Sequence, residues 1–395
     1  MKIALFGGGP AGLMAAYQLS AKHEVHVFEK GKRVGRKFLV AGNGGFNLTN
    51  QATREKLTAV YSNHPQLHQA LLNFSTNDTR TWLSQLGMET FIGSSGRVFP
   101  EKGIKPNQVL QRIMDVLEER KVKVHLDHAF IGFDQANKPI VLANENQITI
   151  EADHYIFGLG GGSWSKTGAN SDWFKHFNAI NVQTLPFQAS NCGLDVDWGD
   201  EFQKKFAGTP IKNIAIQAYG QTFKGEAIIT KYGLEGNAIY PLVPLMRETL
   251  AKKERAYVFI DFKPNSTVEM LQAKISSAVI KPKNYTYAFK LSKAMHAIAK
   301  RNLDKETYLN PSAFATCLKK VLVPIVGLRS VEEAISTVGG ISMDEVDVQF
   351  RLIKHPHISI VGEMLDWDAP TGGFLLQGCF STGFKVGQFL NQSLR

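Results

Sequence analysis

The chain has 395 residues, of which 44% are hydrophobic and 20% charged, and it carries a formal net charge of +10 at pH 7. This length predicts two or three domains with a large buried core, and the composition is ordinary for a globular protein. No apolar run approaches the roughly 20 residues of a membrane span, and Met1-Lys2 leads into an apolar segment without the pattern of a signal peptide. We therefore expect a cytoplasmic protein that has no membrane partner.

The positions of the cysteines and histidines limit the kinds of reactive centre that the chain can form. The three cysteines are far apart and form no CxxC pair, so neither a disulfide framework nor a dithiol redox centre is expected. His355 and His357 flank Pro356 without further residues at metal-ligand spacing, and we predict no metal site. Any redox chemistry then belongs to a cofactor.

The first element is a glycine-rich turn, residues 7–12, between a predicted strand (3–6) and a predicted helix (13–19). Gly7 allows a tight turn, Gly9 lets the backbone approach a pyrophosphate, and Gly12 lets helix and strand pack closely. The helix N-terminus offers free N–H groups and a positive dipole to the anion. We therefore expect a dinucleotide here, bound by Gly7, Gly9, Pro10, Ala11 and Gly12.

A second predicted strand, residues 24–28, ends at Glu29, which lies 17 residues beyond Gly12. An acid at this place binds the adenosine ribose and repels a 2′-phosphate, so an unphosphorylated adenosine is expected. Lys30, Arg36 and Lys37 follow and are assigned to the cofactor site; Arg36 and Lys37 would neutralise phosphate, although surface cations are usually only solvated.

The loop 41–50 is dense in glycine and asparagine. Asn43 and Asn47 are assigned to the cofactor site, where they would hydrogen-bond a ring system or the substrate; asparagine equally serves turns. Residues 65–87 and 107–120 predict helices, the second amphipathic, and residues 121–126 a strand that returns to the sheet.

Three short strands, residues 130–133, 140–142 and 148–150, predict an antiparallel meander. Residues 155–159 form an apolar strand that runs into glycines, which places main chain against a ligand. Phe130, Gly160 and Gly161 are therefore assigned to the cofactor site.

The character of the chain changes near residue 186. Residues 214–218, 227–229 and 257–262 predict strands, and residues 267–326 predict basic helices. Beyond residue 337 glycine-rich strands return, with a strand at 358–361 and a final helix to 394. We expect a nucleotide-binding domain in two parts, 1–187 and 333–395, with a β-rich insertion (188–265) and a basic helical insertion (266–332).

The positive charge is concentrated in residues 251–330, which hold fifteen Lys/Arg and five Asp/Glu, so this segment carries the whole excess of ten. Such a segment suits an RNA or ribosome partner, or it solvates helix faces. The sequence leaves both readings open.

The motifs of the chain together resemble the BaiN/YhiN-like flavoproteins. They are GGGPAG with Glu29, residues 35–50, GRVFP (96–100), ITKYGLEG (229–236), GGIS and residues 362–383. The resemblance implies an α/β fold: a glutathione-reductase-type, Rossmann-like FAD-binding domain interrupted by a β-barrel-like plus helical insertion. It also implies an NAD(P)/FAD-dependent oxidoreductase, with reduction of conjugated C=C bonds in steroid-like substrates or in uracil rings of ribosomal RNA.

The chain departs from the family pattern at two places. It has Gly45-Phe46 where many members carry Arg-Cys, and Lys231 where many carry His. Any role that the cysteine or the histidine has in other family members is therefore not assigned to this chain.

The far end of the chain suits the rest of an FAD molecule. Glu363, after Gly362, is placed like the acid that binds the ribityl chain in this fold, and Gly372 and Gly373 begin a helix. Its first N–H groups are expected at flavin N1 and O2, where they stabilise the reduced flavin. The residues assigned to the cofactor here are Gly362, Glu363, Gly372, Gly373, Phe374 and Leu375.

No second complete GxGxxG is present, so NADH or NADPH is expected to bind transiently as reductant. Hydride would pass through flavin N5 to an electron-poor carbon, with a proton from a side chain or water. The candidate proton donors are Lys231, Tyr232, Asp366 and Asp368. Each of them could equally be a structural or surface polar residue. Two other functions stay open: a flavin-binding RNA or ribosome-associated protein with structural FAD, and an oxygen-using oxidase or monooxygenase.

Overall fold

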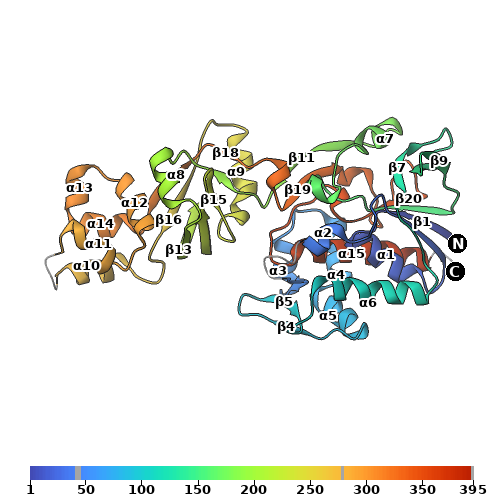
Figure 1. The fold of residues 1–395 in the computed structure, drawn as a ribbon, viewed down its shortest axis with the longest axis horizontal. Coiled ribbons are helices and arrows are strands. Elements are labelled where there is room, and N and C mark those ends of the chain that lie inside the picture. Colours follow the sequence, from blue (N-terminus) through green and yellow to red (C-terminus); the bar gives the residue numbers. More distant parts are fainter. Residues whose placement is uncertain (41–45, 277–279, 393–395) are drawn as a thin grey trace. The chain divides into compact units, whose positions relative to one another are not determined.

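The computed structural model describes residues 1–40, 46–276 and 280–392 (Figure 1). The chain forms two compact units: unit 1 is Met1–Gln188 with Ile335–Arg395, and unit 2 is Ala189–Ala334. Each unit has its own hydrophobic core. The two sequence-distant parts of unit 1 therefore build one domain.

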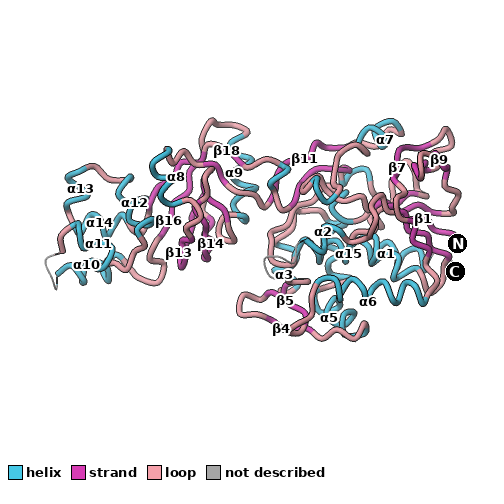
Figure 2. The backbone as a smooth tube through the Cα atoms, in the orientation of Figure 1, coloured by secondary structure: helices cyan, strands magenta, loops and turns pink. Residues whose placement is uncertain are grey.

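Unit 1 contains a five-stranded parallel sheet in the order β20-β10-β1-β2-β6, and its strand β1 is labelled in Figure 2. Its strands are β1 (Lys2–Phe6), β2 (Glu24–Phe28), β6 (Lys123–His125), β10 (His154–Phe157) and β20 (Ile358–Ile360). Parallel strands of an α/β sheet are buried on both faces, which agrees with the fully buried β10 and β20. The order places the carboxyl ends of β1, β2, β10 and β20 at one edge of the sheet.

Helices α1 (Pro10–Leu19) and α15 (Phe374–Gln392) pack along each other in unit 1 (Figure 1). Gly383 makes this possible, because a Cβ there would lie 2.3 Å from the backbone oxygen of Ala11. The predicted amphipathic helix is α6 (Pro106–Glu119), which buries Val109, Ile113 and Leu117. Helix α1 thus contacts strands β1 and β2 as well as the helices α6 and α15.

The predicted helical stretch 65–87 is two helices, α4 (Pro65–Asn73) and α5 (Thr76–Gln85). Phe74 leaves the helical region, with φ −137° and ψ 86°. Asp78 then accepts a hydrogen bond of 2.7 Å from the N–H of Ser75, which forms a capping box that starts α5. The break is therefore set by a local cap.

Smaller elements complete unit 1. The predicted meander is an antiparallel three-stranded sheet, β7-β8-β9, and a second small sheet has the order β3-β5-β4. Their bounds, with those of the paired β11 and β19 and the short helices, are β3 (Thr49–Asn50), β4 (Thr90–Ile92), β5 (Arg97–Pro100), β7 (Ala129–Phe133), β8 (Pro139–Ala143), β9 (Asn146–Thr149), β11 (Thr184–Ser190), β19 (Ser336–Ile341), α2 (Arg36–Val40), α3 (Arg54–Ala59) and α7 (Phe174–Ala179).

Unit 2 is built on a seven-stranded antiparallel sheet in the order β17-β16-β13-β14-β15-β12-β18. The strands are β12 (Leu194–Asp195), β13 (Pro210–Ala218), β14 (Gln221–Ile229), β15 (Gly233–Glu235), β16 (Ala256–Asp261), β17 (Val321–Ile325) and β18 (Gly327–Leu328). The helices are α8 (Asp200–Phe206), α9 (Val243–Leu250), α10 (Val268–Ser276), α11 (Tyr285–Ala288), α12 (Lys293–Arg301), α13 (Lys305–Leu309) and α14 (Pro311–Cys317).

Two sequence predictions in unit 2 were wrong in detail. The hairpin β13–β14 turns at Tyr219-Gly220, both with positive φ, so its second strand begins earlier than predicted. Residues 321–325, predicted helical, form the edge strand β17, where buried and exposed side chains alternate with period two. An edge strand tolerates Pro324, which has no N–H to pair.

Over residues 1–40, 46–276 and 280–392, no helix is both long and apolar enough to cross a bilayer. The same described residues contain no cluster of three or more His, Cys, Asp or Glu side chains arranged to hold a metal ion.

Candidate active site

The glycine loop joins β1 to α1 and makes close contacts with backbone atoms. Gly7 has φ +103°, and a Cβ there would lie 2.3 Å from the carbonyl oxygen of Gly158. A Cβ at Gly12 would lie 2.2 Å from the carbonyl oxygen of Gly7, whereas one at Gly9, the N-cap of α1, would meet nothing within 4 Å. Gly7 and Gly12 therefore serve the fold, and Gly9 leaves open space where a ligand can approach.

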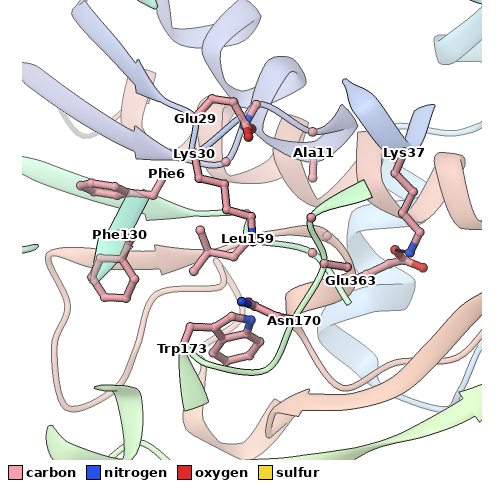
Figure 3. Close-up of a pocket in the computed structure, with 18 of the residues that line it drawn as sticks. Phe6, Ala11, Glu29, Lys30, Lys37, Phe130, Leu159, Asn170, Trp173 and Glu363 are labelled. Atoms are coloured by element: carbon pink, nitrogen blue, oxygen red, sulfur yellow. Dashed lines mark hydrogen bonds and ion pairs between the residues drawn. The ribbon is translucent and has the colours of Figure 1, made fainter. Parts of the chain in front are cut away.

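A cavity of ≈ 410 Å³ opens beside this loop (Figure 3). It is lined by the loop, by the ends of β2 and β10, by β7 and by the segment after β20. The predicted cofactor residues that line it are Gly7, Gly9, Pro10, Ala11, Glu29, Lys30, Arg36, Lys37, Phe130, Gly160, Gly161, Gly362 and Glu363. Residues more than 350 positions apart thus meet in one cavity because their strands are neighbours in the sheet.

Glu29 is held in place by backbone donors. Its Oε2 accepts a hydrogen bond of 2.9 Å from the N–H of Gly8, and its Oε1 accepts one of 2.8 Å from the N–H of Gly31. An ionised carboxylate has about four acceptor positions, so two remain for hydroxyl donors. An oriented carboxylate of this kind fits the two hydroxyls of an adenosine ribose.

Lys37 and Glu363 form an ion pair at the opposite side of the cavity (Figure 3). Lys37 Nζ lies 2.9 Å from Glu363 Oε2 and donates a second hydrogen bond of 2.7 Å to Ser163 Oγ. Arg36 Nη2 donates to the carbonyl oxygen of Lys166 at 3.0 Å. These two cations therefore also connect α2 to the segment after β10, which the sequence analysis did not anticipate.

Aromatic rings form an apolar wall of the same cavity. Phe6 and Phe28 line it and stack on each other with ring centroids 5.3 Å apart; His125, which does not line the cavity, stacks on Phe28 at 4.6 Å. Burial, and then the neighbouring His26, lower the pKa of His125, so this ring stays neutral at neutral pH. An apolar, uncharged wall suits a planar base. Lining residues that the sequence analysis missed include His128, Leu159, Asn170 and Trp173.

The start of α15 is a second place where backbone N–H groups are available to a ligand. Gly372 and Gly373 have φ of +100° and +102°, and a Cβ on Gly373 would lie 2.3 Å from the backbone of Thr49. Among the described residues, no acceptor pairs with the N–H groups of Gly373, Phe374 and Leu375. Because Gly373 and Phe374 are buried, a bound ligand is the expected acceptor.

The remaining predicted cofactor residues lie apart from the cavity. Gly12, Gly372, Gly373, Phe374 and Leu375 do not line it. Asn47 is half-buried just before β3, and Asn43 lies outside the described residues.

The four candidate proton donors are divided between the two units. In unit 2, Lys231 is exposed, and Tyr232 donates a hydrogen bond of 2.5 Å to Glu235. Burial, and then this hydrogen bond, raise the pKa of Tyr232 well above its usual value. In unit 1, Asp366 accepts a hydrogen bond of 2.8 Å from the N–H of Gly339, and the backbone N–H of Asp368 donates to a serine hydroxyl.

The parallel sheet, the glycine loop and the converging acids define a class of protein. The chain is an FAD-dependent oxidoreductase with a glutathione-reductase-type, Rossmann-like domain interrupted by an antiparallel insertion. A family model described as the HI0933-like protein Rossmann domain matches residues 1–389, and the chain belongs to this family.

Similar proteins extend over the whole chain. A 3-dehydro-bile acid delta(4,6)-reductase of Clostridium scindens is 22% identical, with 98% of each chain covered. A ribosomal RNA dihydrouridine synthase of Haemophilus influenzae is 23% identical, with 96% of each chain covered. The crystal structure of a 3-ketosteroid delta1-dehydrogenase from Sterolibacterium denitrificans matches with a TM-score of 0.55 at 13% identity, covering 99% of each chain. This last likeness concerns the fold alone.

Proposed function

We propose that this protein reduces a conjugated C=C bond of a small molecule, with NADH or NADPH as a transient reductant. The observation that carries the proposal is the convergence of Gly9, Glu29 and Glu363 on one cavity. The buried N–H groups at the start of α15, which have no acceptor in the described part of the chain, add a place for negative charge. When bound, FAD supplies the hydride chemistry.

The chain's own residues would bind and orient the cofactor and supply a proton. Glu29 would accept the ribose hydroxyls, and the Lys37–Glu363 pair would hold the central part of the molecule. Tyr232 donates its hydroxyl proton to a hydrogen bond with Glu235, and burial raises its pKa, which makes it a weaker acid. Lys231, Tyr232, Asp366 and Asp368 all stay candidates for the proton donor.

Anaerobic spectroscopy tests the proposal. The purified protein should be yellow, NADH or NADPH should bleach it, and a conjugated enone should restore the colour. A suitable panel includes 3-dehydro bile acids with delta(4,6) unsaturation. A protein that cannot be reconstituted with FAD contradicts the proposal. Rapid recolouring by air, with none by any enone, would favour an oxidase or monooxygenase instead.

A second candidate function is uridine reduction in ribosomal RNA, favoured by the basic segment of unit 2. On one sheet face there, Tyr257 is 45% exposed, and Lys320 Nζ lies 4.7 Å from the ring centroid of Phe259. Exposed rings with nearby cations suit stacked bases and phosphates. A deletion strain with unchanged dihydrouridine in its ribosomal RNA would exclude this function.

A third possibility, RNA binding with a structural FAD, can be distinguished from both reductase functions by experiment. Charge reversal in the basic segment should abolish salt-dependent RNA binding while flavin bleaching by NADH or NADPH continues. The lysines to reverse together are Lys281, Lys283, Lys290 and Lys293. RNA binding that does not depend on salt would contradict a role for these charges.

A further inference from the structure

Arg97 lies beside the turn that begins α15. It is the first residue of β5, and its antiparallel register partner on β3 is Asn50. Asn50 Nδ2 donates a hydrogen bond of 3.0 Å to the carbonyl oxygen of Gly372. Arg97 Nε lies 3.5 Å from the position that a Cβ of Gly372 would occupy. The GRVFP segment, which had no assigned role, therefore delivers a guanidinium to the Gly372-Gly373 turn.

The charge of Arg97 has no counter-ion in the part of the chain that the structure describes. Its side chain is half-buried, and no carboxylate or other acceptor there pairs with its guanidinium. By contrast, Arg329 and Arg351 have carboxylate partners at 3.2 Å or less. Partial removal of a guanidinium from water costs free energy unless an anion or acceptor replaces the water. The position of Arg97 therefore suits an anionic ligand.

A second, independent feature favours negative charge at the same place. The N–H groups of Gly373 and Phe374 are buried and unpaired among the described residues, and they lie at the positive end of the 19-residue helix α15. Gly372 has no side chain between this helix end and Arg97. A guanidinium and a helix N-terminus thus converge on one turn.

We propose that Arg97 stabilises the negative charge that a bound flavin acquires at N1 and O2 when it is reduced. The proposal rests on the proposed placement of the flavin at the start of α15. Oxidised flavin is neutral and reduced flavin carries the charge, so a nearby cation binds the reduced form more tightly. Arg97 therefore raises the tendency of the flavin to accept electrons. The planar fork of its donors matches two acceptor atoms on one ring edge.

The experiment compares the holoenzyme with R97Q, R97K and the control R54Q. Arg54 is exposed on α3 of unit 1, so its loss removes the same charge away from the turn. Sulfite adds to oxidised flavin and leaves negative charge on the ring, so its dissociation constant reports the same electrostatics. The midpoint potential, measured by equilibration with a redox dye, is the second readout.

R97Q is expected to raise the sulfite dissociation constant about tenfold, which corresponds to a midpoint potential about 30 mV lower for a two-electron couple. R97K, which keeps the charge but not the fork, should change the constant by about threefold. R54Q should stay within about twofold of the wild type, because exposed charges are screened.

Two results would overturn the proposal. One is R97Q with its FAD spectrum intact and both readouts unchanged. The other is an equal change in R97Q and R54Q. If R97Q does not retain FAD, R97K is compared with R54Q instead. A loss of flavin affinity in R97K, with its sulfite constant and midpoint potential unchanged, would assign Arg97 to flavin binding and overturn the proposal. Neither readout needs NADH, NADPH or an enone, so failure of the reductase assay does not affect them.

Discussion

Gln377 connects the start of α15 to three other parts of unit 1. Its side chain is fully buried; Oε1 accepts hydrogen bonds from Thr49 Oγ1 at 2.6 Å and from Thr79 Oγ1 at 2.8 Å. Its Nε2 donates to the carbonyl oxygen of Phe74 at 2.8 Å and to Ser381 Oγ at 3.0 Å. We predict that Q377M, which keeps the shape and removes the polar atoms, strongly destabilises the protein.

The magnitude follows from the groups that lose a partner. The hydroxyls of Thr49 and Thr79 are fully buried and would have no acceptor, at a cost of about 1–3 kcal/mol each. The carbonyl oxygen of Phe74 keeps its hydrogen bond of 2.8 Å from Ser381. The sum is a loss of about 4 kcal/mol in the free energy of unfolding.

Urea denaturation of the FAD-free protein measures this loss without the stabilising effect of bound cofactor. Gln392, exposed at the other end of α15, provides the control Q392M, which should change stability by less than about 0.5 kcal/mol. The triple variant T49V/T79V/Q377M should recover much of the loss, because no buried donor then lacks an acceptor. A single Q377M variant as stable as the control would refute the reasoning.

Four further outcomes are expected. G7A should destabilise the apoprotein by about 3 kcal/mol in urea, because its Cβ would meet the backbone of Gly158 at a positive φ. G9A should keep wild-type stability and weaken FAD binding in a fluorescence titration; equal stability losses in the two variants would contradict their separate roles. Burial lowers the pKa of His154 to about 4, below its unfolded value. The free energy of unfolding should therefore have its full value above about pH 6.5 and fall by about 3 kcal/mol as the pH drops to 4. H154Q should lose this part of the pH dependence. Stopped flow of Y232F, D366N and D368N separates the candidate proton donors: loss of the donor should slow recolouring by an enone and leave bleaching by NADH or NADPH unchanged, and a variant with unchanged turnover removes its residue from the reaction.

Local sequence patterns were sufficient to predict the glycine loop and the elements beside it. The glycine loop, the acid at the end of the second strand and the amphipathic helix 106–119 each depend on residues within one turn or one helix face. Backbone geometry sets their spacing, so these features can be recognised in the sequence alone. The family resemblance, carried by such motifs, is confirmed, as is the FAD-dependent oxidoreductase class.

Tertiary structure decided which residues act together. Lys37 and Glu363 are 326 positions apart and meet because β20 joins the sheet beside β10. Arg97 reaches the start of α15 only because β5 pairs with β3. Gly7 and Gly9 look alike in the motif, yet the first contacts Gly158 and the second faces open space. Such pairings depend on long-range strand order, which no local pattern encodes, and they separate the glycines that build the fold from the one that leaves room for a ligand.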